Sequence, residues 1–411
     1  MSDAMEERAS ALSFRQLRLF AAIGDLKSVR RASEECSLSQ PAVTQALAKL
    51  EEAVGAPLVD RRASGSYLNE AGAVFHARVK RFFGQVEEAV LVVDAAAGPV
   101  SARAIVNRFT RAQIRTLVAS VENRSFERAA EALGISPSSL QRAARDLEGN
   151  LGIALFYRTA AGILVSPAGM TFGRRMRLAL QEIELGIDEV DVATGSGGRQ
   201  IVIGAMPFGG SVLLASVLDD FLSSHPAADI RIVNDSAPEM KKALRDGDVD
   251  LVIGLLPDQL DEGLSGMPLA PTPYSVVVRR GHPLTAKGRV ETADVVGYDW
   301  VVGTPGSSRR ACFDRLFEDS GGPTARIATC ALNVLHHLLK NSDRLTLMTS
   351  YELEHGDDTL RALPFAPILP EPSIGLMMRE NWMPTRVHAD FIEIVRAQVA
   401  RTTPKLRRVA S

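Results

Sequence analysis

The chain has 411 residues, 46% apolar and 23% charged, which is long enough for two or more domains of ordinary globular composition. No stretch approaches the roughly 18 consecutive apolar residues of a membrane helix, and the acidic, polar start does not have the pattern of a secretory signal. Three cysteines, Cys36, Cys312 and Cys330, show no metal-ligand spacing and fit a reducing compartment, so we expect a cytoplasmic protein.

The net charge of −2 is unevenly distributed along the chain. Residues 11–84 carry eleven Lys/Arg and seven Asp/Glu, and residues 101–177 carry twelve Arg and five acidic residues. The second half of the chain is acidic. A basic first half is typical of a surface that faces phosphate, so the charge pattern favours nucleic-acid binding by that half alone.

The first half contains an internal repeat. Residues 17–72 align without a gap with residues 114–169, and 17 of these 56 pairs are identical. The match continues weakly beyond Gly72, with pairs such as Arg78/Arg175. An ungapped match of this length indicates a duplicated module.

Each copy has the pattern of three helices followed by a hairpin. In the first copy Leu17, Phe20, Ala21 and Ile23 give one helix a buried face, Ser28 precedes a short helix over 29–35, and Ser39 is the expected N-cap of a third helix. The third helix should bury Val43, Leu47, Leu50 and Val54, and its counterpart Leu140, Ala144, Leu147 and Leu151. Gly134 should form the turn between the helices of the second copy, where the first copy has Ser37.

A third helix with this pattern has the shape and residue types for the DNA major groove, where Gln pairs with adenine and Arg with guanine. Arginines beside the following turn are typical of a wing that contacts phosphate. The predicted DNA-binding residues are Ser39, Gln40, Ala42, Thr44, Gln45, Lys49, Arg61 and Arg62 in the first copy, and Ser136, Ser138, Ser139, Gln141, Arg142, Arg145 and Arg158 in the second. The alternative is an amphipathic three-helix bundle without DNA contacts, which shows the same spacings.

Residues 17–72 resemble the winged helix-turn-helix of LysR-type transcriptional regulators, on Leu17-Arg-Leu-Phe20, Ser39-Gln-Pro-Ala-Val-Thr44, Leu50-Glu51 and Ala71-Gly72. The second copy keeps Arg128-Ala-Ala130, Leu147-Glu148 and Pro167-Ala-Gly169 but has Pro137-Ser-Ser-Leu140 where the family has Gln-x-Ala-Val. Family members normally carry one such module. The resemblance implies a multidomain fold with winged helix-turn-helix modules at 11–71 and 108–168, linker helices at 72–97 and 169–194, and an effector-binding domain at 199–400.

From residue 199 short apolar segments alternate with helical ones, which favours an α/β fold with a parallel sheet. This half resembles the effector domain of the same regulators, in the branch of galactose-binding-protein and protocatechuate-pathway regulators. Such a domain is similar to periplasmic solute-binding proteins, with one lobe at about 199–273 and 350–400, the other at about 279–345, and crossings near 274–278 and 345–351.

The resemblance, together with loops that precede helices, implies a cleft for a small organic acid, aromatic or sugar-derived effector. The predicted lining residues are Phe208, Gly209, Ser211, Ser236, Thr304, Pro305, Ser307 and Arg309, with Arg309 as the partner of a ligand carboxylate. Simple turns are the alternative for these loops. We expect no cofactor and no metal: His336, His337 and His355 lack metal spacing. Cys312 and Cys330 form either a redox switch or two inert buried thiols.

The sequence thus predicts a non-enzymatic transcription regulator with double-stranded DNA and a small organic effector as partners. We expect a homo-oligomer, dimer or tetramer, in which the two modules pair within one chain, and we also consider the transcription machinery as a partner. Three rivals stay open: a second copy that only spaces or dimerises, a cytosolic solute-binding protein whose repeat mediates protein contacts, and an enzyme built on the C-terminal domain, for which no catalytic motif is present.

Overall fold

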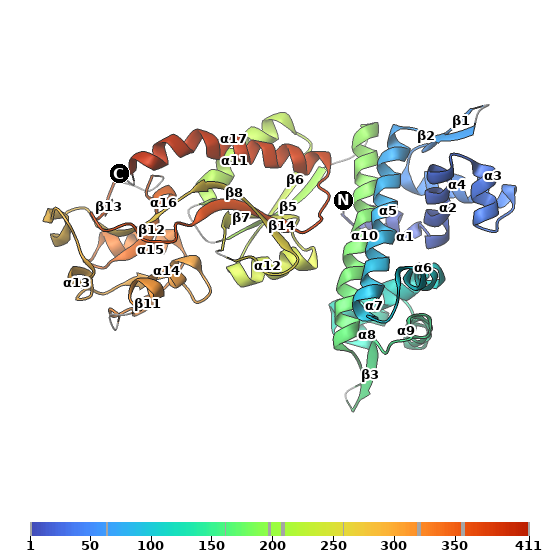
Figure 1. Ribbon diagram of the computed structural model, residues 1–411, viewed down its shortest axis with the longest axis horizontal. Helices are drawn as coiled ribbons and strands as arrows, with labels where there is room; N and C mark the ends of the chain where they lie inside the picture. Colours follow the sequence, from blue (N-terminus) through green and yellow to red (C-terminus); the bar gives the residue numbers. More distant parts are fainter. Residues whose placement is uncertain are drawn as a thin grey trace. The chain divides into compact units, whose positions relative to one another are not determined.

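The computed structural model describes residues 2–62, 65–160, 162–195, 199–206, 210–257, 259–318, 322–354 and 358–409. The chain divides into two compact units, unit 1 (Met1–Arg199) and unit 2 (Gln200–Ser411). Figure 1 shows the mostly helical unit 1 and the α/β unit 2. None of the described helices is both long and apolar enough to cross a membrane.

Unit 1 contains the same series of elements twice, and the two series differ by 97 residues. The first module comprises α1 (Ser2–Ala11), α2 (Phe14–Leu26), α3 (Val29–Glu35), α4 (Gln40–Val54), β1 (Val59–Arg62), β2 (Gly65–Leu68) and α5 (Glu70–Val93). The second comprises α6 (Pro99–Arg108), α7 (Arg111–Asn123), α8 (Phe126–Ala132), α9 (Pro137–Leu151), β3 (Phe156–Thr159), β4 (Gly162–Val165) and α10 (Pro167–Thr194). The helices α1 and α6, which precede the repeat found in the sequence, were not predicted.

The short helices begin where the sequence places their caps. The Ser28 side chain accepts from the N–H of Arg31, and Ser125 accepts from that of Arg128 in the second module. The turns after these helices need a left-handed residue, and Ser37 and Gly134 both have positive φ, 51° and 64°. The turn predicted at these two positions is confirmed, including the serine in the first copy.

The two long helices α5 and α10 pack along each other within one chain, and the modules lie beside this pair, one toward each end (Figure 1). The N-terminal helix of each module packs on the long helix of the other: α1 contacts α10, and α6 contacts α5. Arg18 of α2 donates to the carbonyls of Val106 and Phe109, and Arg111 of α7 donates to the carbonyl of Leu12. Each module therefore packs directly against helices of the other.

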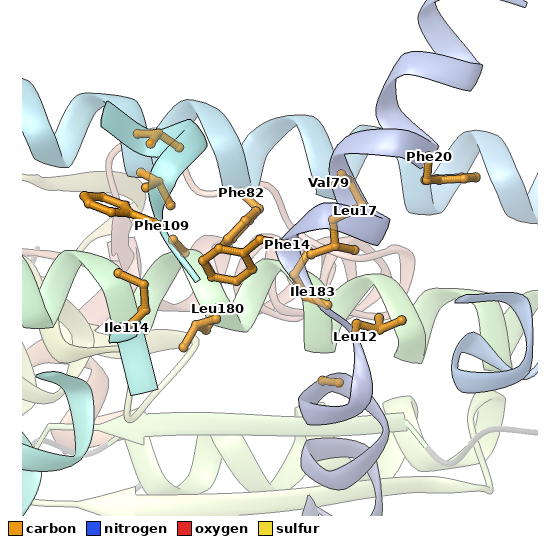
Figure 2. Close-up of a cluster of buried hydrophobic side chains, with 14 of the residues drawn as sticks. Leu12, Phe14, Leu17, Phe20, Val79, Phe82, Phe109, Ile114, Leu180 and Ile183 are labelled. Atoms are coloured by element: carbon orange, nitrogen blue, oxygen red, sulfur yellow. The ribbon is translucent and has the colours of Figure 1, made fainter. Parts of the chain in front are cut away.

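A single apolar core fills the space where the modules meet. Figure 2 shows Phe14 of the first module between Phe82 of α5 and Leu180 of α10, with Leu12 beside Ile183 on one side and Phe109 and Ile114 of the second module on the other. The rings of Phe14 and Phe82 meet edge to face with centroids 4.9 Å apart. Since burial of apolar area is the main stabilising term, the two modules depend on this shared core for much of their stability.

A buried ionic cluster crosses the α5–α10 interface. Arg78 is fully buried and donates to Glu182 at 2.8 Å and to Glu189 at 2.7 Å. Glu182 also accepts from Arg81 at 3.1 Å and from Gln85 at 3.0 Å. Burial alone would lower the pKa of the Arg78 guanidinium, but the hydrogen bonds and charges of the two glutamates more than offset this and raise it.

Unit 2 is an α/β domain with one five-stranded sheet and two smaller ones. The larger sheet has the order β6-β5-β7-β14-β8, and the smaller ones have the orders β12-β9-β13 and β10-β11. The strands are β5 (Arg199–Ala205), β6 (Ala228–Asn234), β7 (Leu251–Leu255), β8 (Leu264–Pro271), β9 (Tyr274–Arg279), β10 (Val301–Val302), β11 (Ile327–Ala328), β12 (Thr346–Thr349), β13 (Leu360–Ala362) and β14 (Ser373–Arg379). The helices are α11 (Gly210–Ser224), α12 (Ala237–Asp246), the 3-10 helix η1 (Pro283–Ala286), α13 (Thr292–Val295), α14 (Ser308–Leu316), α15 (Leu332–Lys340), α16 (Ser350–Glu354) and α17 (Arg386–Val409).

The prediction of a parallel sheet is only partly correct. Strands β5 and β7 are parallel, but β14 runs antiparallel to both β7 and β8, so the large sheet is mixed. The segments predicted to cross between lobes lie side by side: β12 pairs antiparallel with β9, from Thr349 opposite Tyr274 to Thr346 opposite Val277. Beside them the hydroxyl groups of Thr272 and Ser350 are 3.1 Å apart.

Candidate nucleic-acid interface and effector region

The predicted recognition helix of the first module, α4, separates a buried face from an exposed one. Its inward residues are Val43, Leu47, Leu50 and Val54, all at most 3% exposed, as predicted. The face away from this core carries polar side chains: Ser39, Gln40, Thr44, Gln45 and Lys49 are exposed, and Ala42 is half-buried. Ser39 takes the N-cap position, although its side chain makes no capping hydrogen bond.

The second module repeats this arrangement with different side chains. Helix α9 buries Leu140, Ala144, Leu147 and Leu151, and Ser136 accepts from the N–H of Ser139 at 3.2 Å. Ser136, Ser138, Ser139, Arg142 and Arg145 are exposed, and Gln141 is half-buried. Each module thus presents a row of hydrogen-bond donors and acceptors on a helix whose opposite face is fixed in the core.

A glutamate in each copy connects this helix to the hairpin that follows. A carboxylate oxygen of Glu51 accepts from the N–H groups of Leu58 and Val59, at 2.7 and 3.2 Å. Glu148 accepts in the same way from Leu155 and Phe156, at 2.8 and 3.0 Å. This positioning role was not predicted from the sequence, although the identical Leu-Glu pairs in the two copies were a signal for it.

The hairpins have the form of wings. Strand β1 pairs antiparallel with β2, and β3 with β4. Arg62 is exposed, with its guanidinium 5.8 Å from the centre of the Tyr67 ring, and Arg158 is exposed on β3. Arg61 lies in β1, and its side chain lies outside the described residues.

The C-terminal ends of the recognition helices are anchored by the helices that the sequence did not predict. Arg8 of α1 donates to the carbonyls of Ala53 and Val54 at the end of α4, and to Asp191 of α10 at 2.6 and 2.9 Å. In the second module Arg108 of α6 donates to the carbonyl of Asn150 near the end of α9, and the Asn150 side chain donates back. The recognition helices are therefore held at their C-terminal ends as well as along their buried faces.

In unit 2 the predicted effector loops are described only in part. Phe208 and Gly209 lie outside the described residues, and Ser211 lies in α11 with its side chain outside the description. Ser236 and Ser307 stand at the N-caps of α12 and α14, and both are half-buried. Ser307 accepts from the N–H of Arg310 and donates to the carbonyl of Thr304; Thr304 is half-buried and Pro305 is exposed.

Arg309 has a partner that the sequence did not predict. It is 5% exposed, and its Nη2 donates to Glu352 at 2.5 Å. Glu352 in turn accepts from the N–H of Thr349 at 2.8 Å. Arg309 Nε and Nη1 have no hydrogen-bond partner among the described residues, so contact with a ligand carboxylate stays a prediction.

A cavity of about 240 Å³ lies in the second module rather than in unit 2. It is bounded by residues of α7, α8, the β3–β4 hairpin and α10, including Ser120, Arg124, Phe126, Tyr157 and Met170. The residues predicted for the effector do not take part in it.

The remaining residues considered from the sequence are the three cysteines and the histidines that lack metal spacing. Cys36, Cys312 and Cys330 are free thiols; Cys312 is buried in the core of unit 2 and Cys330 lies 3.3 Å from the Thr304 hydroxyl. Within the described ranges no group of three or more His, Cys, Asp or Glu side chains is placed to hold a metal ion, and His355 lies outside them.

Comparison with known proteins agrees with this geometry. Residues 194–400 match the LysR substrate binding domain, and residues 14–73 and 112–170 each match the bacterial regulatory helix-turn-helix protein of the lysR family. The HTH-type transcriptional regulator GalR of Pseudomonas putida is 30% identical over 378 residues, covering 89% of this chain and 92% of that protein. PcaQ of Agrobacterium fabrum, also an HTH-type transcriptional regulator, is 26% identical over 66% of this chain and 89% of its own.

Among solved structures, a full-length OxyR variant from Pseudomonas aeruginosa has the same fold, with a TM-score of 0.50 at 19% identity over 70% of this chain and 93% of that one. The curated relatives named above are transcription regulators. The structure has exposed polar recognition helices and wings, the helix-turn-helix model matches the chain twice, and the C-terminal half matches the effector domain. The chain therefore belongs to the LysR family of DNA-binding, effector-responsive transcription regulators.

Proposed function

We propose that each chain carries two winged helix-turn-helix modules, that both contact double-stranded DNA, and that a small organic effector bound in unit 2 modulates this contact. The observation that carries the proposal is the shared design of α4 and α9. Both expose polar and basic side chains opposite a buried apolar face, and both are held by a glutamate to a basic hairpin. Polar and basic side chains on such a helix can reach base edges, while basic residues on the hairpin reach phosphate.

The pairing of α5 with α10 supports the proposal that one chain presents two modules together. In a homo-oligomer, two chains would present four winged helices. Light scattering of the purified protein tests this arrangement: we expect two chains per particle, and a tetramer would contradict it. Because the relatives are regulators, we propose no enzymatic activity and expect the protein to act on DNA in the cytoplasm.

The decisive experiment is a titration of the full-length protein on DNA from upstream of its own gene, with random DNA as the control, at several salt concentrations. We expect preference for the upstream DNA and a log–log salt slope of about −0.9 for each phosphate neutralised. Equal, weak and salt-independent binding to both DNAs would refute the regulator function and favour a solute-binding protein.

Two substitutions test whether both modules bind. Gln45→Ala and Arg142→Ala alter exposed side chains on α4 and α9, and each should weaken specific binding. The matched control is Arg386→Ala, which removes an exposed arginine of unit 2. An effect of Gln45→Ala without any effect of Arg142→Ala would show that the second copy is a spacer.

The effector is proposed to be a small organic acid, aromatic or sugar-derived. The N-termini of α12 and α14, which Ser236 and Ser307 precede, offer N–H groups to an anion. Both tryptophans, Trp300 and Trp382, lie in unit 2, so their fluorescence provides a direct binding signal in a screen of organic acids. No response to any of these compounds, with DNA binding intact, would refute this effector class.

A further inference from the structure

The two modules share their internal architecture in detail. Both recognition helices have 15 residues, and both bury the residues at the same four positions. Glu51 and Glu148 occupy the same position and accept hydrogen bonds from equivalent N–H groups. The buried faces and the glutamate that position the recognition helix are therefore the same in the two copies, whereas the arginines at the C-terminal ends, Arg8 and Arg108, are not equivalent.

The outward faces of the same helices differ at five positions, although the N-cap residues Ser39 and Ser136 are identical. The pairs at equal positions are Ala42/Ser139, Thr44/Gln141, Gln45/Arg142, Ala48/Arg145 and Lys49/Asp146. All ten residues are exposed except Ala42 and Gln141, which are half-buried. One position changes from positive to negative and another from a methyl group to a guanidinium. Two helices with equivalent buried faces and glutamate contacts thus offer unlike donors and acceptors.

These side chains favour different bases. The amide of Gln45 can pair with the N6 and N7 atoms of adenine, whereas the guanidinium groups of Arg142 and Arg145 match O6 and N7 of guanine. Ala48, at the position of Arg145, has no donor for any base. Two identical half-sites would leave one of the helices with unmatched polar groups.

A symmetric dimer binds a symmetric operator. In this chain the pair of long helices is not symmetric, because it consists of two different helices, α5 and α10. In the cluster at the α5–α10 interface Arg78 meets Glu182, while the residue of α5 at the position of Glu182 is Gln85. At the position of Glu189, α5 has Val92. Two α5 helices would therefore bury Arg78 without either of these carboxylates, which is costly, so α5 selects α10.

We propose that one chain reads a non-palindromic site made of two unlike half-sites, an adenine-containing one under α4 and a guanine-containing one under α9. This inference rests on the proposed function. If a longer operator is palindromic, its two-fold symmetry then relates the site of one chain to the site of another chain. The two half-sites bound by one chain still differ from each other.

The test is selection from a random DNA library with the full-length protein, followed by titration of short duplexes that hold one selected site. Where the selected sequence contains two dyad-related sites, each is titrated alone. The selected duplex is compared with two palindromic duplexes, one built from each half-site. We expect each palindrome to bind about tenfold or more weakly, because every mismatched contact costs several-fold in affinity.

Single variants then assign the half-sites. Arg142→Ala should remove the preference for guanine at one position of one half-site, where Arg145 still recognises another guanine, and leave the other half-site unchanged; Gln45→Ala should act only on the adenine-containing half-site. Arg142→Lys keeps the charge but lacks the two-pronged geometry, so it should keep the salt slope and still lose the preference. The control Arg386→Ala should change neither.

The outcomes separate the inference from the proposed function. A selected site whose two halves are identical, or variants that both act on the same half, would overturn the inference and leave sequence-specific DNA binding intact. Failure to select any sequence would refute the proposed function itself.

Discussion

Replacing Arg78 with alanine should destabilise unit 1 by about 3 kcal/mol, because removing one partner of a buried ion pair leaves the other charge unpaired. The side chain of Arg78 is fully buried, and that of Glu182 is 4% exposed. Glu182 retains Arg81 and Gln85, at 3.1 and 3.0 Å, so the loss belongs at the lower end of the range of about 3–5 kcal/mol. For a unit of this size this lowers the melting temperature by about 6–12 °C.

The two units can be followed separately in the full-length protein. Both tryptophans lie in unit 2, whereas most of the helical residues lie in unit 1, so tryptophan fluorescence reports unit 2 and far-ultraviolet circular dichroism reports mainly unit 1. Arg78→Ala should shift the helical transition and leave the fluorescence transition in place.

Arg175 is the matched control, because it occupies the position of Arg78 in the second copy. It makes a 3.3 Å contact with Glu88, and the two side chains are 37% and 64% exposed. An exposed pair of this kind contributes less than about 1 kcal/mol. Equal shifts for Arg78→Ala and Arg175→Ala, or a shift of the fluorescence transition alone, would refute the reasoning.

Three further outcomes are expected. Gly186→Val should destabilise the pair of long helices by about 1–3 kcal/mol because a Cβ there meets the facing helix, whereas Gly84→Ala, in open space, should stabilise the helix by up to about 1 kcal/mol; equal effects in thermal melts would contradict this. Glu352→Ala should cost unit 2 about 3–5 kcal/mol in tryptophan-detected unfolding, because it leaves Arg309 buried without its carboxylate; an unchanged midpoint would contradict it. The pKa of Asp250 lies below its ordinary value, so its contribution is present above about pH 4 and is lost as the pH falls through the folded pKa. The stability deficit of Asp250→Asn, measured by urea unfolding, should therefore shrink in acid, and a deficit independent of pH would count against the assignment.

The cause of the lowered pKa at Asp250 is local. Burial alone would raise the pKa of this carboxyl group, but His388 Nε2 lies 3.3 Å away and the N–H of Val202 donates to it at 2.7 Å. The two contacts more than offset burial and favour the charged carboxylate.

Local patterns in the sequence were sufficient for much of unit 1. The short helix Val29–Glu35 and the buried faces of α4 and α9 follow from apolar spacing and serine caps, which act within a few residues. Gly134 and Ser37 mark the same turn, because backbone geometry there is set locally as well.

Contacts between distant segments could not be predicted in the same way. Helix α1 has few apolar residues, and what fixes it includes the bridge from Arg8 to Asp191, 183 residues away. Arg78 and Arg175 occupy equivalent positions in the repeat, yet one is fully buried and the other only half-buried, because Arg78 and not Arg175 faces the glutamates of α10. The direction of β14 is likewise set by its neighbours in the sheet, since a short apolar run carries no direction.

The linkage of α5 and α10 within one polypeptide bears on whether such a regulator can exchange subunits with other proteins that carry a similar linker helix. Only residues 94–98 separate α5 from α6, and the second long helix is carried in the same chain. A tether of this kind corresponds to an effective concentration on the order of millimolar, far above that of any free subunit. At that effective concentration the linker helix of another protein competes poorly for the interface. The α5–α10 pair therefore forms when the chain folds, and its formation does not depend on how many copies of the protein the cell contains.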